Sequence, residues 1–483
     1  MANQRDHWGS SLAFILAASG SAVGLGNLWK FPYITYQNQG GAFVIVYLLC
    51  IAAIGLPIML AEILIGRRTQ SSPVMAFTQL AAGKPGGKSW ALVGWLGVLT
   101  GAVILAFYSV IAGWSLSSLM QCLKWSFTGY EAPASDAFNQ FVGNGPLQVF
   151  LAFLFSGGTA LIVVRGISGG IEKATKILMP VLFVILIVLV LVSFSLSGSG
   201  KAFSFLFTPD FSNFNWHGGL EALGHAFFTL SLGMGAMITY GSYMQKSESI
   251  NKAAIAIVVL DTVIAIAACI IMFSIIFSFP EIQSAVGRST AGMLFITLPP
   301  MFYTKMPLGS LIGPIFYILV AFAAMSSTIS LLEVVVASIV DKWGINRKKA
   351  TFGAAGAIFF FSILCALSNG ASNFLSTFKP FGHAESGLGH RLNEIFFGNK
   401  EGILNLFDHF SANWMLPVGG LFITIFVGWI LKTKVPAEEL ELRDVSGNPS
   451  ILFRGFQVMI AVIAPLAIAF IIYMVVTGEY SAA

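Results

Sequence analysis

Long apolar segments separated by short polar stretches run along almost the whole chain. About 20 apolar residues are enough for a helix to cross the hydrocarbon core of a bilayer. Segments of that length predict about eleven transmembrane helices, at 9–36, 41–66, 90–122, 148–165, 172–196, 220–245, 252–279, 308–340, 350–368, 408–431 and 453–477. The pattern therefore predicts an all-α polytopic membrane protein, with no soluble domain of useful size between its spans.

The first apolar segment carries an interruption that a lipid-facing helix would not tolerate. Residues 19–32 read SGSAVGLGNLWKFP, which places three glycines, a polar Asn27 and a proline inside one span. Each glycine costs a helix about 1 kcal/mol and a proline about 3 kcal/mol. Backbone groups that are freed in hydrocarbon find no water to bond. We therefore expect this backbone to open onto ions, a substrate or a water-filled cavity.

A second interruption lies five spans later, where residues 228–236 read FTLSLGMGA. Two broken helices at corresponding positions of two five-helix halves are typical of inverted-repeat secondary transporters. The halves would be repeat 1 at about 9–197 and repeat 2 at about 220–431, with an extra helix at about 453–477. Glycine-rich helices that merely pack closely are the alternative, but close packing gives no reason for Asn27, Thr229 and Ser231 beside the breaks.

Composition agrees with a membrane protein and adds its orientation. The 483 residues are 56% hydrophobic and 10% charged, whereas soluble domains carry about 25% charged residues. Basic clusters such as Arg67–Arg68 and Arg347–Lys349 fall on loops of one side, and such loops face the cytoplasm. We therefore expect a cytoplasmic N-terminus, an external C-terminus and no nucleic-acid partner. The sequence has no Asn-x-Ser/Thr acceptor for N-glycosylation. This fits the plasma membrane (inner membrane) of a bacterium better than a glycosylated eukaryotic cell surface.

Four motifs resemble the neurotransmitter:sodium symporter family, and in particular its bacterial branch that carries several hydrophobic amino acids. The resemblance runs from Arg5 to about Gly428 and implies a leucine-transporter-type fold, a 5+5 inverted repeat with helices 1 and 6 broken. The rule on paired broken helices was itself drawn from this fold, so it adds no separate support. The motifs are GSAVGLGNLWKFPY at 20–33, GGAF at 40–43, FFTLSLG at 227–233 and SST at 326–328.

This resemblance implies two bound Na⁺ ions and no organic cofactor. Of these two ion sites, the second has only uncharged oxygen ligands, which favours a monovalent ion over Ca²⁺ or Mg²⁺. The first site would use Ala22, Asn27, Thr229 and Asp261. The second site would use Gly20, Val23, Ala323, Ser326 and Ser327.

Asp261 departs from the family pattern, which has an Asn at this position. Animal relatives bind chloride nearby, partly through a serine four residues later, where this chain has Ala265. Tyr47 and His225 would surround that place. A fixed carboxylate supplies the negative charge directly, so we expect transport that does not need chloride. A further hypothesis is that Asp261 takes up a proton after Na⁺ leaves, which would give proton antiport on the return.

The same resemblance indicates a site for amino acids rather than monoamines. Monoamine-carrying relatives have an Asp where this chain has Gly24, and glycine leaves room for the carboxylate of the substrate beside the Tyr108 hydroxyl. A pocket without charge disfavours charged side chains, and the flexible Met234 suits a range of apolar ones. The predicted substrate-binding residues are Ala22, Gly24, Leu25, Gly26, Ile104, Tyr108, Phe228, Thr229, Ser231, Met234, Ser327 and Leu331.

Gates on both sides of this site follow from the resemblance. On the outer side Lys30 and Asp408 would approach each other above a lid of Tyr108 and Phe228. The family usually has Arg at position 30, and Lys does not form the planar bidentate pair. The inner gate would consist of Arg5, Trp8, Tyr243 and Asp341.

One glycine–proline pair and two glutamates concern the helices around the site. Gly170 and Pro180 both weaken a helix, and their spacing resembles a family pattern that marks unwinding of the fifth span during Na⁺ release. Glu62 and Glu333 are predicted to brace the broken helices.

Together these features predict a Na⁺-coupled symporter that imports hydrophobic L-amino acids by alternating access, and not an enzyme. A transporter of another zwitterion (taurine, GABA or betaine) and an amino acid sensor that does not transport remain alternatives. A channel is disfavoured because the polar residues converge on one central site. The residues leave open the physiological amino acid, the oligomeric state, the role of the eleventh helix and whether protons are counter-transported.

Overall fold

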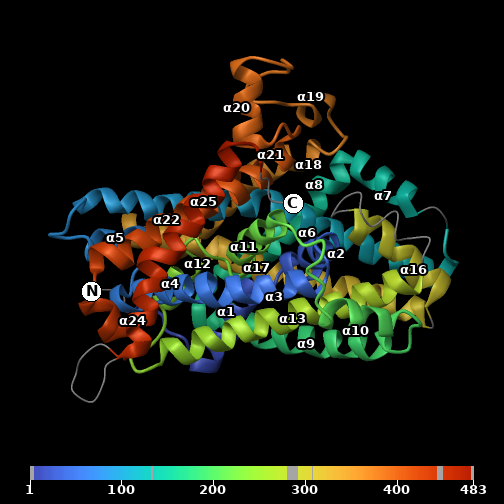
Figure 1. The fold of residues 1–483 in the computed structure, drawn as a ribbon. Coiled ribbons are helices and arrows are strands. Elements are labelled where there is room, and N and C mark those ends of the chain that lie inside the picture. Colours follow the sequence, from blue (N-terminus) through green and yellow to red (C-terminus); the bar gives the residue numbers. More distant parts are fainter. Residues whose placement is uncertain (1–4, 132–133, 280–291, 307, 443–449, 480–483) are drawn as a thin grey trace.

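The computed structural model describes residues 5–131, 134–279, 292–306, 308–442 and 450–479, with the side chain of Lys305 left aside. Every regular element in these residues is a helix (Figure 1). In this part of the chain nine helices are long and apolar enough to cross a membrane, or ten if one bent pair is a single span. The predicted all-α polytopic fold is thereby confirmed.

All eleven predicted spans lie on helices. Short π-helical segments (η1, η2, η4 to η8) and one 3₁₀ turn (η3) continue into neighbouring α-helices. The spans are α1 (Ser11–Ala22), η1 (Gly26–Lys30) and α2 (Phe31–Gln37); α3 (Gly41–Cys50), η2 (Ile51–Gly55) and α4 (Leu56–Thr69); η3 (Gly87–Trp90) and α6 (Ala91–Thr128); α8 (Gly145–Val163); η4 (Ile167–Ile171) and α9 (Glu172–Ser193); α11 (Trp216–Thr229) and α12 (Ala236–Gly241); α13 (Ile250–Ser278); α17 (Gly309–Trp343); α18 (Arg347–Leu367); α21 (Ile403–Phe410), η6 (Ser411–Met415), α22 (Leu416–Ile425) and η7 (Phe426–Leu431); and α24 (Ile451–Val458), η8 (Met459–Ile463) and α25 (Ala464–Val476).

Shorter helices occupy the connections between the spans, and α20 projects away from the bundle (Figure 1). The predicted third span ends too early at 122, because α6 continues to Thr128. The shorter helices are α5 (Pro73–Leu80), α7 (Ala134–Gly143), α10 (Ser199–Phe207), α16 (Leu298–Lys305), preceded by η5 (Met293–Thr297), α19 (Asn373–Ser376), α20 (Leu388–Phe397) and α23 (Lys434–Glu439).

The break in the first span is real but shorter than the stretch 19–32. Only Val23 and Gly24 lie outside the helix, and the chain bends by 51° between its two halves. Pro32 does not interrupt the second half, because it stands in the first turn of α2. The missing N–H of a proline costs little at that position.

The break in the sixth span is longer and depends on left-handed backbone. Residues between Thr229 and Ala236 leave the helix, and Ser231, Gly233 and Gly235 have φ of 53°, 79° and 75°. Glycine adopts these angles freely, whereas a serine there is strained by about 1–2 kcal/mol. Neither α11 nor α12 is long enough by itself to cross a membrane. The sixth span is therefore not among the nine or ten helices counted above.

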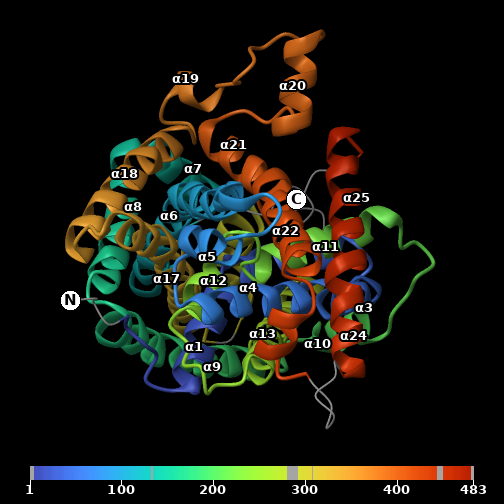
Figure 2. The same cartoon turned by 90° about the vertical axis from the view of Figure 1, so that its left-hand side faces the viewer.

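Both breaks lie in the interior of the bundle. Helices α6 and α17 pack along each other, α1 contacts α9, α13 and α17, and α12 contacts α4. Figure 2 looks along the bundle and shows α4 and α12 in the interior, with α9, α18 and α25 at the periphery. The division into two repeats with an extra helix stays a prediction.

Candidate functional site

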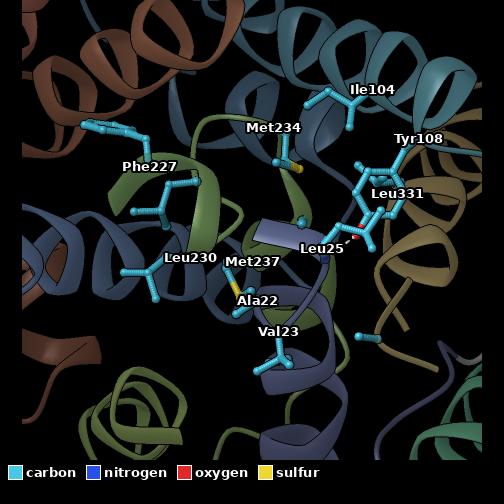
Figure 3. Packing of buried hydrophobic residues seen from close by; sticks show 14 of the residues in the cluster. Ala22, Val23, Leu25, Ile104, Tyr108, Phe227, Leu230, Met234, Met237 and Leu331 are labelled. Carbon is cyan, nitrogen blue, oxygen red and sulfur yellow. Dashed lines mark hydrogen bonds between the residues drawn. The ribbon is translucent and has the colours of Figure 1, made fainter. Parts of the chain in front are cut away.

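A small cavity lies between the two breaks. All the predicted substrate-binding residues line it except Leu25, which lines a neighbouring cavity on the outer side. Figure 3 shows Ile104 and Tyr108 on α6 reaching toward the broken first span. The lining residues are Ser21, Ala22, Gly24, Gly26, Ile104, Tyr108, Phe228, Thr229, Ser231, Met234, Ser327, Ser330 and Leu331.

The backbone of the first break forms the polar end of this cavity. The N–H of Leu25 donates to the Tyr108 hydroxyl at 2.8 Å. A Cβ atom added to Gly24 would lie 2.6 Å from Ser327 Oγ and 2.7 Å from the Tyr108 hydroxyl. No side chain therefore fits at position 24 unless both hydroxyls move.

Two serines of the cavity were missed by the sequence reasoning. Ser21 Oγ donates to Ser330 Oγ at 2.7 Å, and Ser231 Oγ donates to the Ser21 carbonyl at 2.8 Å. The two breaks are therefore joined directly. Ser21 stands beside the predicted break and Ser330 one turn after Ser326, so their spacing was a usable signal.

A buried carboxylate, Asp261 of α13, gathers polar groups from three other helices. Asn27 Nδ2 donates to its Oδ1 at 2.7 Å, Thr229 Oγ1 lies 3.0 and 3.1 Å from its two oxygens, and the Tyr47 hydroxyl donates at 3.3 Å. All four side chains are almost completely buried. Within the described residues no ion pair reaches Asp261. A buried charge without a counter-charge is costly, so the cluster suits a cation.

The place expected for chloride in animal relatives adjoins this cluster. His225 stacks on Phe31 with ring centroids 5.3 Å apart and lies 5.9 Å from the Tyr47 ring. Among the described residues, neither ring nitrogen of His225 finds a hydrogen-bond partner. Ala265, on the same helix as Asp261, is buried and contributes no polar group.

A second group of oxygens lies where α1 ends against α17. Ser326 Oγ lies 2.9 Å from the Ala323 carbonyl and 3.5 Å from the Val23 carbonyl, and Ser327 Oγ lies 3.3 and 3.5 Å from the same two. A Cβ added to Gly20 would lie 3.1 Å from Cβ of Ser326. The five residues predicted for a second Na⁺ are therefore neighbours, with uncharged oxygens between them.

The outer cavity touches the central one through a shared wall. Gly26, Tyr108 and Phe228 line both, as expected for a lid. Lys30 and Asp408 face each other across the outer cavity, but no ion pair within 4.0 Å joins them in the described part of the chain. Lys30 Nζ instead lies 5.4 Å from the Phe228 ring centroid.

The four residues predicted for the inner gate form one cluster, which we name the inner closure. Arg5 Nη1 pairs with Asp341 at 2.7 Å, and the guanidinium lies 4.6 Å from the Tyr243 ring centroid. Trp8 is fully buried, and its indole N–H donates to the Tyr240 carbonyl at 3.0 Å. This closure joins the N-terminal segment to the ends of α12 and α17.

We expect Arg5→Ala to open this inner closure. The ion pair is partly exposed and is therefore worth little alone, but the contact with Tyr243 and a 2.6 Å bond to Ser242 are lost with it. The reporter is a cysteine in place of the buried Ser72, whose N–H donates to Asp341 at 2.7 Å. With Arg5→Ala, this cysteine should react about 10-fold faster with a membrane-impermeant maleimide than it does with Arg5 present. The background lacks the four native cysteines, and Lys348→Ala is the control. An unchanged rate would contradict this role of Arg5.

Glu62 braces the second break as predicted, whereas Glu333 does not. Glu62 Oε1 accepts a hydrogen bond from the Gly233 N–H at 2.7 Å. Glu333 instead accepts from the Tyr243 hydroxyl at 2.7 Å and pairs with Arg347. It lies too far along α17 to reach a break, and it supports the inner closure.

We expect Glu62→Ala to destabilise the protein by about 1–3 kcal/mol, because a buried N–H loses its acceptor. Glu62→Gln keeps an acceptor oxygen and should lose less. The midpoint of thermal unfolding in detergent measures both variants. Equal midpoints for Glu62→Ala and the wild type would show that the bond to Gly233 is unimportant.

The fifth span is helical throughout residues 167–193 in this structure. Gly170 lies in the π-helical segment η4, and Pro180 stands inside α9 without ending it. The predicted unwinding is not seen in these residues and stays a prediction.

Comparison with known proteins gives a consistent result. Residues 5–145 and 139–392 match the sodium:neurotransmitter symporter family. The chain is 34% identical over 464 residues to the uncharacterized sodium-dependent transporter YhdH of Bacillus subtilis (strain 168), covering 95% of each chain. It is 31% identical to an uncharacterized sodium-dependent transporter of Haemophilus influenzae, covering 90% and 91%. A crystal structure of MhsT in complex with L-phenylalanine matches with TM-score 0.82 and 39% identity, covering 99% of this chain and 100% of that one.

Proposed function

This chain belongs to the sodium:neurotransmitter symporter family and is a sodium-dependent membrane transporter, and from that premise we propose that it imports hydrophobic L-amino acids together with Na⁺. The observation that carries the proposal is the cavity between the two helix breaks. One end holds the backbone of Gly24 and Leu25 and the Tyr108 hydroxyl, which accepts from the Leu25 N–H, and the rest is apolar apart from hydroxyls. The phenylalanine in the MhsT structure supports the same class of substrate.

The recognition of substrate follows from the two ends of this cavity. Backbone N–H groups at a helix end favour an anion, so the substrate carboxylate would lie near Gly24 and Leu25. Ile104, Met234 and Leu331 would contact the side chain of the substrate. The described residues that line the cavity include no Asp, Glu, Lys or Arg, so a charged side chain of a substrate would be desolvated without a partner.

Two Na⁺ ions are proposed as co-substrates, one in each group of oxygens. The first would bind at Asp261, Asn27, Thr229 and the Ala22 carbonyl. The second would bind between the end of α1 and the serines of α17. Each group joins two or more helices, so ion binding would favour the arrangement that holds the substrate.

Chloride independence and proton antiport are the finer parts of this proposal. The Asp261 carboxylate would stand next to the place where animal relatives bind chloride, and it would supply the negative charge there while Na⁺ is bound. After Na⁺ leaves, a proton would neutralise the same buried group on the return step.

Alternating access would open the two sides in turn. The contacts of Arg5, Trp8 and Tyr243 would close the inner side, and Tyr108 and Phe228, which line both cavities, would separate the substrate cavity from the outer one. Opening the outer side would need only the lid to move.

The test is uptake of labelled phenylalanine and leucine into proteoliposomes with an inward gradient of Na⁺ or K⁺, each with chloride or gluconate. We expect accumulation that requires Na⁺, is unchanged in gluconate, and is competed by apolar amino acids but not by lysine or glutamate. Binding that needs Na⁺ without accumulation would instead indicate a sensor. No response to either amino acid would overturn the substrate class, and taurine, GABA and betaine would be tested next.

A further inference from the structure

A second cavity of a different kind lies at the end of the bundle that carries the N-terminus. This groove has a volume of about 630 Å³ and is formed by the turn before η3, the first turns of α6 and the inner part of the tenth span. Among the described residues that line it, Ser89 and Trp90 are the ones with side-chain polar groups, and the Trp90 indole donates to the Pro85 carbonyl at 2.9 Å. Its lining residues are Pro85, Gly86, Ser89, Trp90, Leu92, Val93, Leu96, Phe422 and Ile430.

The groove opens on the outer surface of the bundle, where lipid surrounds a membrane protein. Leu92 is 69% exposed and Phe422 is 41% exposed. Trp90 stands at the level where a span begins, and tryptophans at that level sit among lipid headgroups. An apolar groove in this position suits an acyl chain.

Three lysines lie close along the chain to residues that line the groove. Lys84 and Lys88 are the chain neighbours of the lining residues Pro85 and Ser89, and Lys432 follows Ile430 by two positions. In the described part of the chain none of these lysines forms an ion pair. The nearby acids at 438 and 439 already pair with arginines of α4. The charge beside the groove is therefore positive and available.

We propose that this groove binds one anionic phospholipid. An acyl chain lies along Trp90, Leu96 and Phe422, and the phosphate is held by Lys84, Lys88 and Lys432. Basic residues near the cytoplasmic surface attract anionic lipids with a free energy that corresponds to about 5-fold in affinity for each lysine. The apolar wall fixes the place and the lysines select the headgroup.

The bound lipid would also contact a row of packed aromatic rings that leads toward the inner closure. The Trp90 ring lies 4.9 Å from Phe426, and Phe426 lies 4.9 Å from Phe77 of α5. Helix α5 begins directly after Ser72, whose N–H binds Asp341. A lipid that packs against Trp90 would therefore add to the row of packed rings that leads to α5.

The experiment titrates dioleoyl-phosphatidylglycerol into the delipidated full-length protein and counts bound lipid by native mass spectrometry. Dioleoyl-phosphatidylcholine has the same chains without net charge, and glycerol 3-phosphate is an anionic headgroup without chains. We expect phosphatidylglycerol to bind at least about 5-fold more tightly than phosphatidylcholine, with the preference weakening at high salt. Glycerol 3-phosphate alone should not bind.

Matched variants locate the site. Lys84→Ala with Lys88→Ala should weaken phosphatidylglycerol binding about 25-fold, whereas Lys348→Ala with Lys349→Ala, two exposed lysines of α18, should leave it unchanged. Leu96→Trp should fill the groove and abolish the binding of both lipids. The inference is overturned if the first pair behaves like the control pair, if the two lipids bind equally, or if glycerol 3-phosphate binds as tightly as the lipid. None of these measurements requires transport, so they stand apart from the proposed function.

Discussion

Gly24→Ala is expected to reduce substrate uptake strongly. Its Cβ would lie 2.6 Å from Ser327 Oγ and 2.7 Å from the Tyr108 hydroxyl, so both groups have to move. Overpacking of this kind costs about 1–3 kcal/mol, and the new methyl group also fills the space proposed for the substrate carboxylate. Uptake of labelled phenylalanine should fall about 100-fold, with the loss appearing first in binding affinity.

The matched control is Gly219→Ala, on the outer half of the sixth span. A Cβ at that position meets nothing within 4 Å, so uptake should stay close to that of the wild type. Thermal unfolding of both variants separates a local clash from misfolding. Normal uptake by a folded Gly24→Ala protein would show that the substrate does not use this end of the cavity.

The second large effect is expected for Asp261→Asn, which removes one buried negative charge and keeps the shape of the side chain. Two unit charges 4 Å apart interact by about 4 kcal/mol at an effective dielectric constant of 20, which is about 1000-fold in affinity. The Na⁺ concentration that gives half-maximal substrate binding should rise by a factor approaching that value. Chloride in the medium should restore part of the loss, because an anion can then replace the carboxylate.

The control for charge alone is Asp210→Asn, an exposed carboxylate in a loop, which should leave the Na⁺ dependence unchanged. If Asp261 also carries the returning proton, Asp261→Asn should remove the pH dependence of substrate efflux. An unaltered Na⁺ affinity would contradict the role of Asp261 as a Na⁺ ligand. An unaltered pH dependence would contradict its role as the proton carrier. The two readouts are independent of each other.

These predictions share one physical basis, which is that the site exists only between helices. Asp261 lies on α13, but its partners Asn27, Tyr47 and Thr229 come from three other spans. Ser21 of the first break binds Ser330 of α17 and accepts from Ser231 of the second. Ions and substrate that bind these groups would therefore change the free energy of the whole helix arrangement, which is the requirement for coupling.

Much of this architecture is encoded locally and was predicted from the residues. Apolar length determines the spans, and the cost of Gly20, Gly24 and Gly26 in a helix marks the first break. The left-handed residues of the second break follow from Gly233 and Gly235 in the same way. Motifs at 20–33 and 227–233 indicated which side chains gather at the centre, and the structure brings these residues together.

Only the tertiary structure decided what depends on distances between helices. Leu25 points to the outer cavity because the bend at Val23 and Gly24 turns the chain, and the serine contacts across the two breaks need three spans in register. Glu333 turned out to pair with Arg347 and Tyr243. In the described part of the chain Lys30 and Asp408 form no ion pair, and the fifth span is helical. The residue types do not determine the state of a predicted gate, because the conformations of a protein differ by only a few kcal/mol. The free-energy cost of a helix break is large and local, so the residue types reveal it. The state of a gate depends on a small free-energy difference between conformations, to which the whole fold contributes.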